Sequence, residues 1–586
     1  MVNNMANSNL HSIINFIWSV ADDVLRDHYK KGEYPNVILP MTVLRRIDLS
    51  LDDTKADVVK AYTEYKDKII NPQGLLESAS KKKYYNYSKY TLKTLLNEPK
   101  NLKENTLSYL NSYSENVKDI IDKFELKNIV EKCSRDGILF SLIEKFTDPK
   151  VAITPTDLSN HEMGHIFEDL IRRFNEENNE EAGEHFTPRE VIKLMNRIVF
   201  DPVKDKINGI GTILVYDPAC GTGGMLSESK EYLKDTLKYD GFIHLFGQEV
   251  NDKTFATCKA DLLIKGENPD GVAFGSTLSN DGFPDKKFDF MLTNPPYGKT
   301  WKDDQKKLLV GDGKKKQIVD SRFQIGIPRV SDGQLLFVEH MLSKLKTDTE
   351  LGSRIASVHN GSALFTGDAG QGESEIRKYL FENDLIETII ALPTNIFYNT
   401  GIPTYIFIIS NNKIVDRRGK VQLINATSEK FYTNLRKPLG EKRVEISDPQ
   451  IDIIFEIYTK FEESEFSKIF DNSDFGYTQI KVHQPKKDLD GKIIRNKNGG
   501  VEIDKNIEDI ENIPLKISID NFFNEEVRKY YPDAWYEPDE SKIGYEVNFN
   551  KYFYRFVPPR TSEEILKELR KLDSDTDSLF KDITKS

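Results

Sequence analysis

A glycine-rich turn that follows an apolar run near the middle of the chain constrains its fold more than any other feature. The run covers residues 212–216, and its length and β-branched residues are typical of a buried parallel strand. The turn that follows it is Asp217-Pro218-Ala219-Cys220-Gly221-Thr222-Gly223-Gly224, and we expect a helix to begin near Thr222. Strand, turn and helix in this order predict one unit of a doubly wound α/β sheet.

The composition of this turn indicates which ligand it suits. Leu226 stands where a dinucleotide fingerprint has its third glycine, and no Gly-Lys-Ser/Thr follows, which argues against nicotinamide, flavin and phosphate-loop sites. Glycines allow the methionine part of a cofactor to approach the backbone, and a helix N-terminus favours its carboxylate. We interpret Cys220 as a small packing residue and not as a nucleophile.

A second motif, Asn294-Pro295-Pro296-Tyr297, follows the apolar run 288–292. The prolines stiffen the backbone beyond a strand end, so the Asn294 side chain and the Pro295 carbonyl can both face a planar amino group. Two acceptors on the hydrogens of such a nitrogen favour a pyramidal form whose lone pair can attack a sulfonium methyl, and Tyr297 offers a stacking face. Alone, the motif also fits a rigid surface turn. With the glycine turn, it predicts a methyl-transfer site that needs no strong base and no metal.

The pair of motifs resembles amino-methyltransferases that use S-adenosylmethionine. The segment 182–191 also resembles the Phe-Thr-Pro segment that closes over the methionine end of the cofactor in adenine-N6 DNA methyltransferases, and its order before the other two motifs is the gamma arrangement. The resemblance implies that five residues of this segment contact the cofactor: Glu184, His185, Phe186, Thr187 and Pro188.

Three further segments, 164–174, 331–337 and 400–404, look like the modification (M) subunit of type I restriction-modification systems. The resemblance runs from about residue 10 to the C-terminus. It implies an adenine-specific DNA methyltransferase that acts on a base flipped out of the duplex. It also implies that a separate specificity subunit reads the DNA sequence, that a second copy of this chain flanks it, and that a translocase-nuclease subunit can join.

Two more strand ends supply candidate cofactor contacts. The run 242–246 ends at Gly247-Gln248-Glu249, and an acid after the second strand of such a sheet is placed to accept both ribose hydroxyls, so Glu249 takes that role. The run 274–278 fits the third strand end, with Ser276, Thr277 and Leu278 as candidates for contacting the cofactor's adenine. The family pattern often has Asp or Asn at the position of Ser276, so this sequence departs from it there.

The 586 residues exceed the usual limit of a single core, and the patterns divide the chain into three parts. Residues 1–155 predict a helical domain, and residues 156–425 predict the Rossmann-like methyltransferase domain, with later strands at 354–358, 385–392 and 404–409. Residues 426–586 predict a helical and hairpin extension, in which Asp490-Gly491 and Asn498-Gly499 are turn signals.

The end of the chain predicts a helix that begins with the capping box Thr561-x-x-Glu564. Its apolar stripe comprises Ile565, Leu569, Leu572 and Leu579. The stripe approximates a short coiled-coil seam, so it can pack on another subunit or on the body of this chain, and both alternatives are open.

The net charge of −12 is unusual for a protein that binds DNA, because phosphate neutralisation supplies most of the affinity. Either the basic residues gather on one face or a partner carries the DNA. Residues 299–329 carry nine Lys and Arg against four Asp, which suits a backbone contact beside an extruded base and suits a mobile solvated loop equally well.

The cysteines and the hydropathy indicate where the chain works. Cys133, Cys220 and Cys258 have no metal-binding or disulfide spacing, and no signal peptide or long apolar span is visible. We therefore expect a cytoplasmic protein with no metal and no membrane partner.

Other functions compatible with these motifs are a stand-alone adenine methyltransferase, a protein-glutamine N5 methyltransferase and a catalytically idle scaffold that binds the cofactor. A glutamine amide presents a planar amino group similar to that of adenine, but the Phe-Thr-Pro segment and the large flanking parts argue against this substrate. The intact Asn294 and Tyr297 argue against the scaffold. The residues after the sheet look too helical and hairpin-like for an obvious target-recognition domain, which argues against the stand-alone enzyme.

Overall fold

The computed structural model describes residues 13–150, 187–311, 317–398, 400–496, 499–554 and 561–583, with a few single residues between 151 and 186. The chain divides into two compact units, Met1–Val547 and Asn548–Ser586. In the described part of the chain, no helix has the length and apolarity that a membrane span requires.

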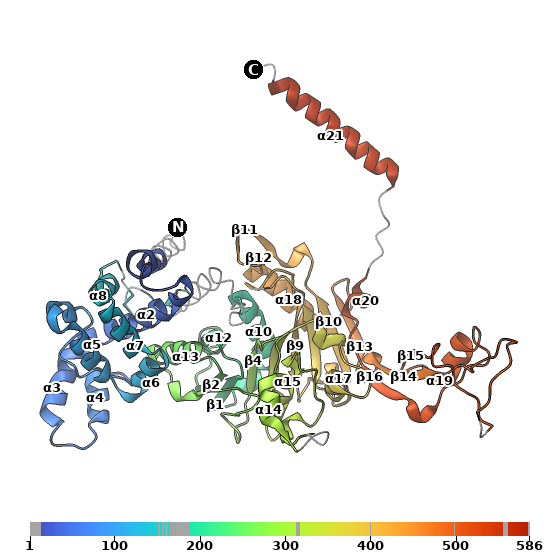
Figure 1. Ribbon diagram of the computed structural model, residues 1–586, viewed down its shortest axis with the longest axis horizontal. Coiled ribbons are helices and arrows are strands. Elements are labelled where there is room, and N and C mark those ends of the chain that lie inside the picture. The colour runs from blue at the N-terminus through green and yellow to red at the C-terminus, as the bar shows by residue number, and fades with distance from the viewer. Residues whose placement is uncertain are drawn as a thin grey trace. The chain divides into compact units, whose positions relative to one another are not determined.

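The N-terminal part is helical, as expected for residues 13–150 (Figure 1). Residues 13–20 form a helix that continues into a π-helical turn, after which the helices are α2 (Pro35–Ser50), α3 (Lys55–Tyr65), α4 (Gln73–Ser80), α5 (Leu102–Asn111), α6 (Glu115–Lys123), α7 (Leu126–Arg135) and α8 (Leu139–Thr147). Their apolar faces form one core that also takes in Ala256, Ala260 and Leu263. These three residues belong to α13 (Asp252–Ile264) of the next part, so the helical part packs directly on the sheet domain.

A nine-stranded sheet forms the centre of the first unit, in the order β13-β10-β8-β9-β7-β4-β1-β2-β3. The strands are β1 (Thr212–Asp217), β2 (Phe242–Glu249), β3 (Val272–Phe274), β4 (Phe290–Thr293), β7 (Arg354–Asn360), β8 (Ile386–Ala391), β9 (Thr404–Ser410), β10 (Lys420–Asn425) and β13 (Ser467–Asp471). The strands β3, β2, β1, β4 and β7 are mutually parallel, whereas β9 runs antiparallel to both of its neighbours. The strands expected from the apolar runs are all present.

Helices cover both faces of this sheet, which confirms the doubly wound α/β expectation (Figure 1). On one face, α10 (Arg189–Phe200), α12 (Gly224–Glu231) and α18 (Asp448–Lys460) share a core with Ala356, Val358 and Ile408. Side chains alternate between the faces of a strand, so the buried Ile355 and Phe407 point to the opposite side. Of the helices on that side, α15 (Gln334–Ser343) and α16 (Ser362–Phe365) contact β7, and α17 (Gly372–Glu382) contacts both helices.

The sheet continues beyond residue 425, where the sequence pattern places the end of this part. Strand β13 pairs antiparallel with β10. Inside the core, the Arg354 guanidinium donates to both carboxylate oxygens of Glu387, at 3.0 and 3.1 Å, and to the Tyr458 hydroxyl of α18 at 3.1 Å. These contacts anchor α18 to the sheet. Residues 448–471 are therefore part of the same body as the strands before them.

Shorter elements complete the first unit. They are α11 (Lys204–Ile207), α14 (Lys302–Leu308), the hairpin β5 (Leu309–Val310) and β6 (Gln317–Ile318), and the hairpin β11 (Thr433–Leu439) and β12 (Lys442–Glu445). A separate three-stranded sheet, β15-β14-β16, comprises β14 (Gly476–Val482), β15 (Asp509–Pro514) and β16 (Lys542–Tyr545), next to α19 (Ile519–Phe522). The turn expected at Asp490-Gly491 lies between Lys487 and Ile493, which pair with each other. Asn498 lies outside the described residues.

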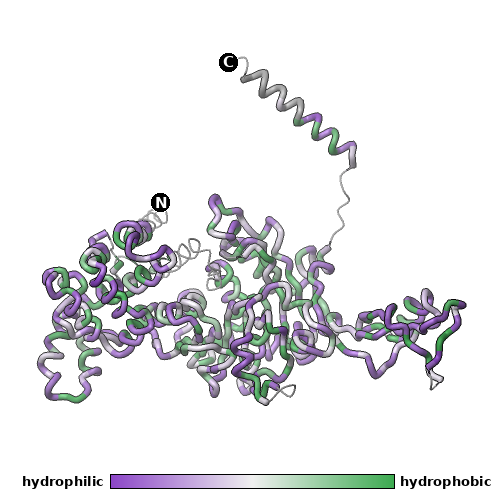
Figure 2. The backbone as a smooth tube through the Cα atoms, viewed as in Figure 1, coloured by the Kyte–Doolittle hydropathy of each residue, from purple (hydrophilic) through white to green (hydrophobic). Residues whose placement is uncertain are grey.

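The second unit contains α20 (Phe549–Phe553) and α21 (Ser562–Ile583). The predicted capping box is confirmed: the Thr561 N–H donates to Glu564 Oε2 at 3.0 Å, and the Glu564 N–H donates to Thr561 Oγ1 at 3.3 Å. The stripe residues Ile565, Leu569 and Leu572 are exposed to 40%, 56% and 63%. Hydrophobic and hydrophilic residues alternate along this part of α21 (Figure 2). The side chain of Leu579 lies outside the described residues.

Candidate functional site

A pocket lies at the edge of the sheet where the parallel strands β1 to β4 have their carboxyl ends. The strand order changes direction between β1 and β4, and the crevice at such a point is the usual ligand site of open α/β sheets. The pocket has a volume of about 160 Å³. Its lining comes from all four strand ends and from the segment after β4: Pro218, Ala219, Gln248, Glu249, Val250, Gly275, Ser276, Thr277, Leu278, Asn294, Pro296, Lys299, Thr300, Trp301, Asp304, Gly333 and Phe337.

The glycine turn between β1 and α12 has a backbone that requires glycine. Gly221 and Gly223 have φ values of +54° and +84°, in the left-handed region that L-residues avoid. A Cβ atom at Gly223 would lie 2.7 Å from the Sγ atom of Cys258. The turn is also fixed to β2, because the Cys220 N–H donates to the Gln248 carbonyl at 3.0 Å. Helix α12 begins at Gly224, two residues after the expected start at Thr222.

Cys220 is a buried free thiol whose Sγ lies 4.0 Å from the Sγ of Cys258. The hydrogen bond to Cys258 and burial both raise the pKa of the Cys220 thiol well above its usual range. A thiol with so little thiolate character is a poor nucleophile, which supports its interpretation as a packing residue. Among the residues that the structure describes, no three side chains of the metal-binding types come together as a site.

Asp217 ends β1 as a buried carboxyl group, and its Oδ1 accepts the Ala219 N–H at 3.0 Å. Burial raises the pKa of Asp217 to about 7. The neighbouring Ala219 lines the pocket, whereas Asp217 supports the turn from behind. A positively charged ligand group near this turn would therefore favour the ionised form of Asp217.

Glu249 joins the glycine turn to the end of β2. It is buried, its Oε2 accepts the Gly221 N–H at 3.1 Å, and its Oε1 accepts the Asn251 N–H at 2.8 Å. These bonds orient the carboxylate while it lines the pocket. Each carboxylate oxygen has a second lone pair, so two hydroxyl donors can still be accepted. Its contact with a ribose stays a prediction.

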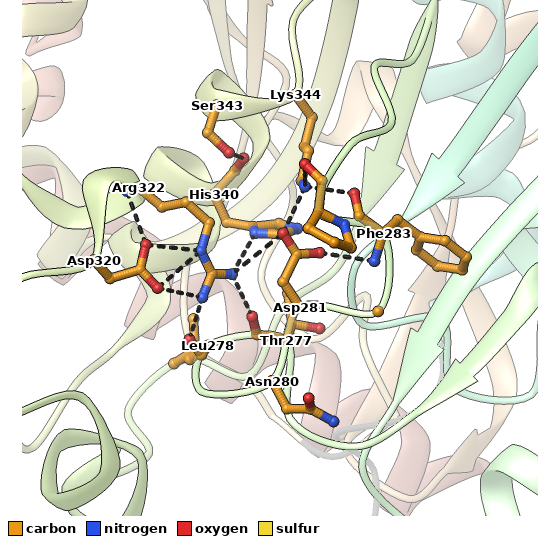
Figure 3. Close-up of polar contacts among 12 residues, drawn as sticks. Thr277, Leu278, Asn280, Asp281, Phe283, Asp320, Arg322, His340, Ser343 and Lys344 are labelled. Atoms are coloured by element: carbon orange, nitrogen blue, oxygen red, sulfur yellow. Dashed lines mark hydrogen bonds and ion pairs between the residues drawn. The ribbon is translucent and has the colours of Figure 1, made fainter.

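The wall that follows β3 consists of Gly275–Leu278 and is fixed on both sides; written by number, it is the segment 275–278. The Thr277 hydroxyl donates to the Pro218 carbonyl, and Ser276 Oγ accepts the Leu278 N–H at 3.3 Å. From the other side, the Arg322 guanidinium donates to the carbonyls of Thr277, at 2.8 Å, and Leu278, at 2.7 Å (Figure 3). The wall is thus held by a residue far along the chain.

Arg322 belongs to a buried polar cluster (Figure 3). It donates to Asp320 and to Nδ1 of His340, at 3.0 Å for the latter. Arginine has no acceptor, so Nδ1 accepts and the proton of the neutral imidazole lies on Nε2, which donates to the Tyr216 hydroxyl at 3.0 Å. Burial lowers the pKa of His340 to about 3, which keeps the ring neutral.

The basic segment 299–329 is more ordered than a solvated loop in its described residues. It contains α14, the hairpin β5–β6 and the buried Trp301, and the Arg322 side chain is only 11% exposed. Arg329 is directed towards Asp332 and Glu373. Arg322 therefore cannot contact a DNA phosphate, and the expected excess of available positive charge is smaller than the sequence suggests.

Asn294 and Pro296 line the pocket, whereas Pro295 is buried and Tyr297 packs partly against the core. The Oδ1 atom of Asn294 is buried and has no hydrogen-bond partner among the described residues. A buried acceptor without a donor is costly, typically about 1–3 kcal/mol, and such an atom at a pocket is ready for a ligand N–H. The loop then turns at Gly298, whose N–H donates to Asp332 Oδ1 at 3.1 Å.

The structure thus brings together seven of the predicted site residues on one pocket: Ala219, Glu249, Ser276, Thr277, Leu278, Asn294 and Pro296. Another group surrounds the site without lining the pocket: Thr187, Pro188, Asp217, Cys220, Gly221, Thr222, Gly223, Gly224, Pro295 and Tyr297. Glu184, His185 and Phe186 lie outside the described residues. Their roles remain predictions.

Sequence reasoning missed the part of the lining that follows the Asn-Pro-Pro-Tyr motif. Thr300, Trp301, Asp304 and Phe337 all line the pocket. Trp301 could have been found, because an aromatic residue so close to the motif in a strongly basic segment has no obvious solvent role. Asp304 could not, because its neighbour Asp303 has the same chemistry in the sequence.

Comparison with known proteins assigns the chain to a class. The sequence profile of the N-6 DNA Methylase family matches residues 158–483, which is more than half of the chain. The chain therefore belongs to the N-6 DNA methylase family. The HsdM N-terminal domain profile matches residues 13–146, the helical part.

Several relatives are subunits of restriction enzymes. The type I restriction enzyme MjaVII methylase subunit of Methanocaldococcus jannaschii is 28% identical over 63% of this chain and 59% of its own length. The MjaIX methylase subunit of the same organism is 26% identical over 77% of each chain. The crystal structure of a type I restriction-modification methyltransferase subunit from Streptococcus thermophilus has the same fold, with a TM-score of 0.61 and 23% identity over 80% of this chain and 97% of that one.

Proposed function

We propose that this chain transfers the methyl group of S-adenosylmethionine to N6 of an adenine flipped out of duplex DNA. The observation that carries the proposal is the shared pocket of Asn294, Glu249 and the wall 275–278, in which the buried Asn294 Oδ1 has no partner among the described residues. One pocket thus joins an unused acceptor for an amino group to an acid suited to ribose hydroxyls. Membership of the N-6 DNA methylase family supports the same chemistry.

The chain's own residues divide the work between cofactor and base. Glu249 and the glycine turn would hold the ribose and methionine parts of the cofactor, which supplies the electrophilic methyl group when it is bound. Asn294 Oδ1 and the Pro295 carbonyl would accept the two hydrogens of the target amino group, and Tyr297 would stack on the base. A flipped base is required, because N6 inside a duplex is paired and cannot meet a sulfonium in line.

The same proposal includes the context of the enzyme. A separate specificity subunit reads the DNA sequence, a second copy of this chain completes the complex, and a translocase-nuclease subunit can join it in the cytoplasm. The names of the relatives, which are methylase subunits of type I restriction enzymes, support this arrangement. The net charge of −12 supports it as well, because an acidic chain gains little DNA affinity from phosphate contacts alone.

A methylation assay tests the proposal. The chain, co-purified with its partners, is incubated with DNA and methyl-labelled cofactor, and the DNA is digested to nucleosides. We expect label in N6-methyladenosine. Asn294→Ala should lower the rate at least about a hundredfold with nearly unchanged cofactor affinity, whereas Asn383→Ala, an exposed change at the end of α17, should have no effect. Label in protein glutamine, or a wild-type rate for Asn294→Ala, would contradict the assignment.

A further inference from the structure

The pocket contains three side chains with oxygen acceptors besides Asn294 whose hydrogen bonds can be compared. The Gln248 amide is fully used, since Nε2 donates to the carbonyls of Gly275 and Asn280 and Oε1 accepts the Gly282 N–H at 3.1 Å. Both oxygens of Glu249 already accept a backbone N–H. The third side chain is Asp304, and it has the simplest environment of the three.

Asp304 reaches the pocket from α14, outside the sheet. Its Oδ1 accepts the Ser279 hydroxyl at 2.7 Å, and its Oδ2 has no hydrogen bond or ion pair within the described residues. The preceding residue, Asp303, has the opposite orientation: its side chain is 89% exposed and pairs with Lys306 at 2.7 Å. One of two adjacent carboxylates is thus turned inward and held in place by a hydroxyl, although solvent is available to it on the other face of the helix.

The position of Asp304 within the pocket indicates which ligand group it meets. The pocket runs from the glycine turn past Glu249 at the end of β2 to the wall 275–278 after β3. Ser279, which holds Asp304, directly follows that wall. A ligand whose ribose lies at Glu249 and whose methionine part lies at the glycine turn therefore places its base at the wall, beside Asp304.

A carboxylate only accepts hydrogen bonds, so it selects a donor on the base. On the accessible edge of adenine, the only donor is the exocyclic amino group. We propose that Asp304 accepts a hydrogen bond from the exocyclic amino group of the cofactor's adenine and makes the pocket selective for adenine. The inference rests on the proposed function, because it takes S-adenosylmethionine as the ligand.

Binding of two ligands to the full chain tests the inference by calorimetry without DNA. The first is S-adenosylhomocysteine, and the second is its deaminated analogue, in which a 6-oxo group replaces the amino group. The wild-type chain should prefer the first, because an oxo group meets the carboxylate as a second acceptor. Asp304→Ala should weaken binding of the first ligand about tenfold and should not weaken binding of the second. Asp304→Asn, which offers an amide donor, should bind the analogue more tightly than the wild type does.

Asp303→Ala serves as the matched control, since Asp303 lies next to Asp304 on the same helix but faces solvent. It should bind both ligands as the wild type does, and thermal melting should show that every variant is folded. An equal loss of affinity for both ligands in Asp304→Ala, or no loss for either, would overturn the inference while leaving the proposed function intact. Failure of the wild-type chain to bind S-adenosylhomocysteine would instead contradict the proposed function, and the inference with it.

Discussion

The Asp332 carboxylate accepts the backbone N–H of Gly298 at 3.1 Å, and this bond ties the loop after Asn294-Pro295-Pro296-Tyr297 to the start of α15. Its second oxygen accepts the Ser362 hydroxyl and the Gln334 amide, both at 2.7 Å. Asp332 is buried, so these bonds are protected from water. The position of the loop is therefore set by a polar network from β7, α15 and α16 as well as by its two prolines.

Replacing Asp332 by Ala should impair the chemical step more than cofactor binding. The change leaves the Gly298 N–H without its acceptor, which frees the end of the loop that carries Asn294 and Tyr297. We expect the methylation rate at saturating cofactor to fall at least about tenfold, because small displacements of positioning groups are costly. Affinity for S-adenosylhomocysteine should change less than about twofold. A parallel loss of rate and affinity would show that Asp332 supports the whole pocket and has no particular effect on the loop.

Gly223→Ala should weaken both folding and the cofactor pocket. The new Cβ would lie 2.7 Å from Cys258 Sγ, and the residue would keep a φ of +84° that alanine disfavours. We expect a loss of stability of about 1–3 kcal/mol, measured by chemical denaturation. The double variant Gly223→Ala/Cys258→Ala removes the clash and leaves the backbone strain, so it should recover part of the lost stability beyond the cost of Cys258→Ala alone. No recovery would mean that backbone strain dominates.

The buried Glu339 predicts a stability that falls as pH rises. Burial raises the pKa of its carboxyl group from 4.5 to about 8. Between these values the unfolded chain loses this proton and the folded chain keeps it, so unfolding releases a proton and the free energy of unfolding decreases with pH, by at most about 1.4 kcal/mol per unit. Glu339→Gln carries no such proton. The variant should gain stability relative to the wild type from pH 5 to pH 8 in denaturation experiments, and a difference that is constant across this range would contradict the pKa of Glu339.

Local patterns in the sequence were enough to predict the strands and the capping box. The run before Asp217 and the pair Thr561 and Glu564 are determined by residues close together in the chain, and the structure has both where they were expected. The environment of Arg322 could not be predicted in this way. Its partners, Thr277 and His340, come from other elements, and only the folded topology brings them together.

The extent of the sheet shows the same limit. Strand β13 pairs with β10 across an intervening hairpin and helix, so its place in the sheet depends on long-range contacts that hydrophobic periodicity does not record. The inward orientation of Asp304 depends on the rotation of α14 about its own axis, and a short charged helix has no apolar stripe that would predict this rotation.

The exposed stripe of α21 predicts that a partner is needed for sequence-specific activity. Ile565, Leu569 and Leu572 are all at least 40% exposed, and such a stripe on a capped helix suits packing against another helix. The purified chain alone should bind S-adenosylhomocysteine but bind duplex DNA weakly and without sequence preference.

Removing the chain after Pro559 should abolish co-purification with the partner, as should the point variant Leu569→Glu, while thermal stability and cofactor affinity stay unchanged. The physical reason is that an exposed stripe contributes little to the stability of its own chain and much to a shared seam, whose burial stabilises the complex by mass action. Glu568→Gln, a change of a polar neighbour on α21, is the matched control and should assemble normally. A truncated chain that assembles fully but melts at a lower temperature would show that the helix packs on its own body. Site-specific adenine methylation by the isolated chain at the rate of the complex would show that DNA recognition lies within these 586 residues.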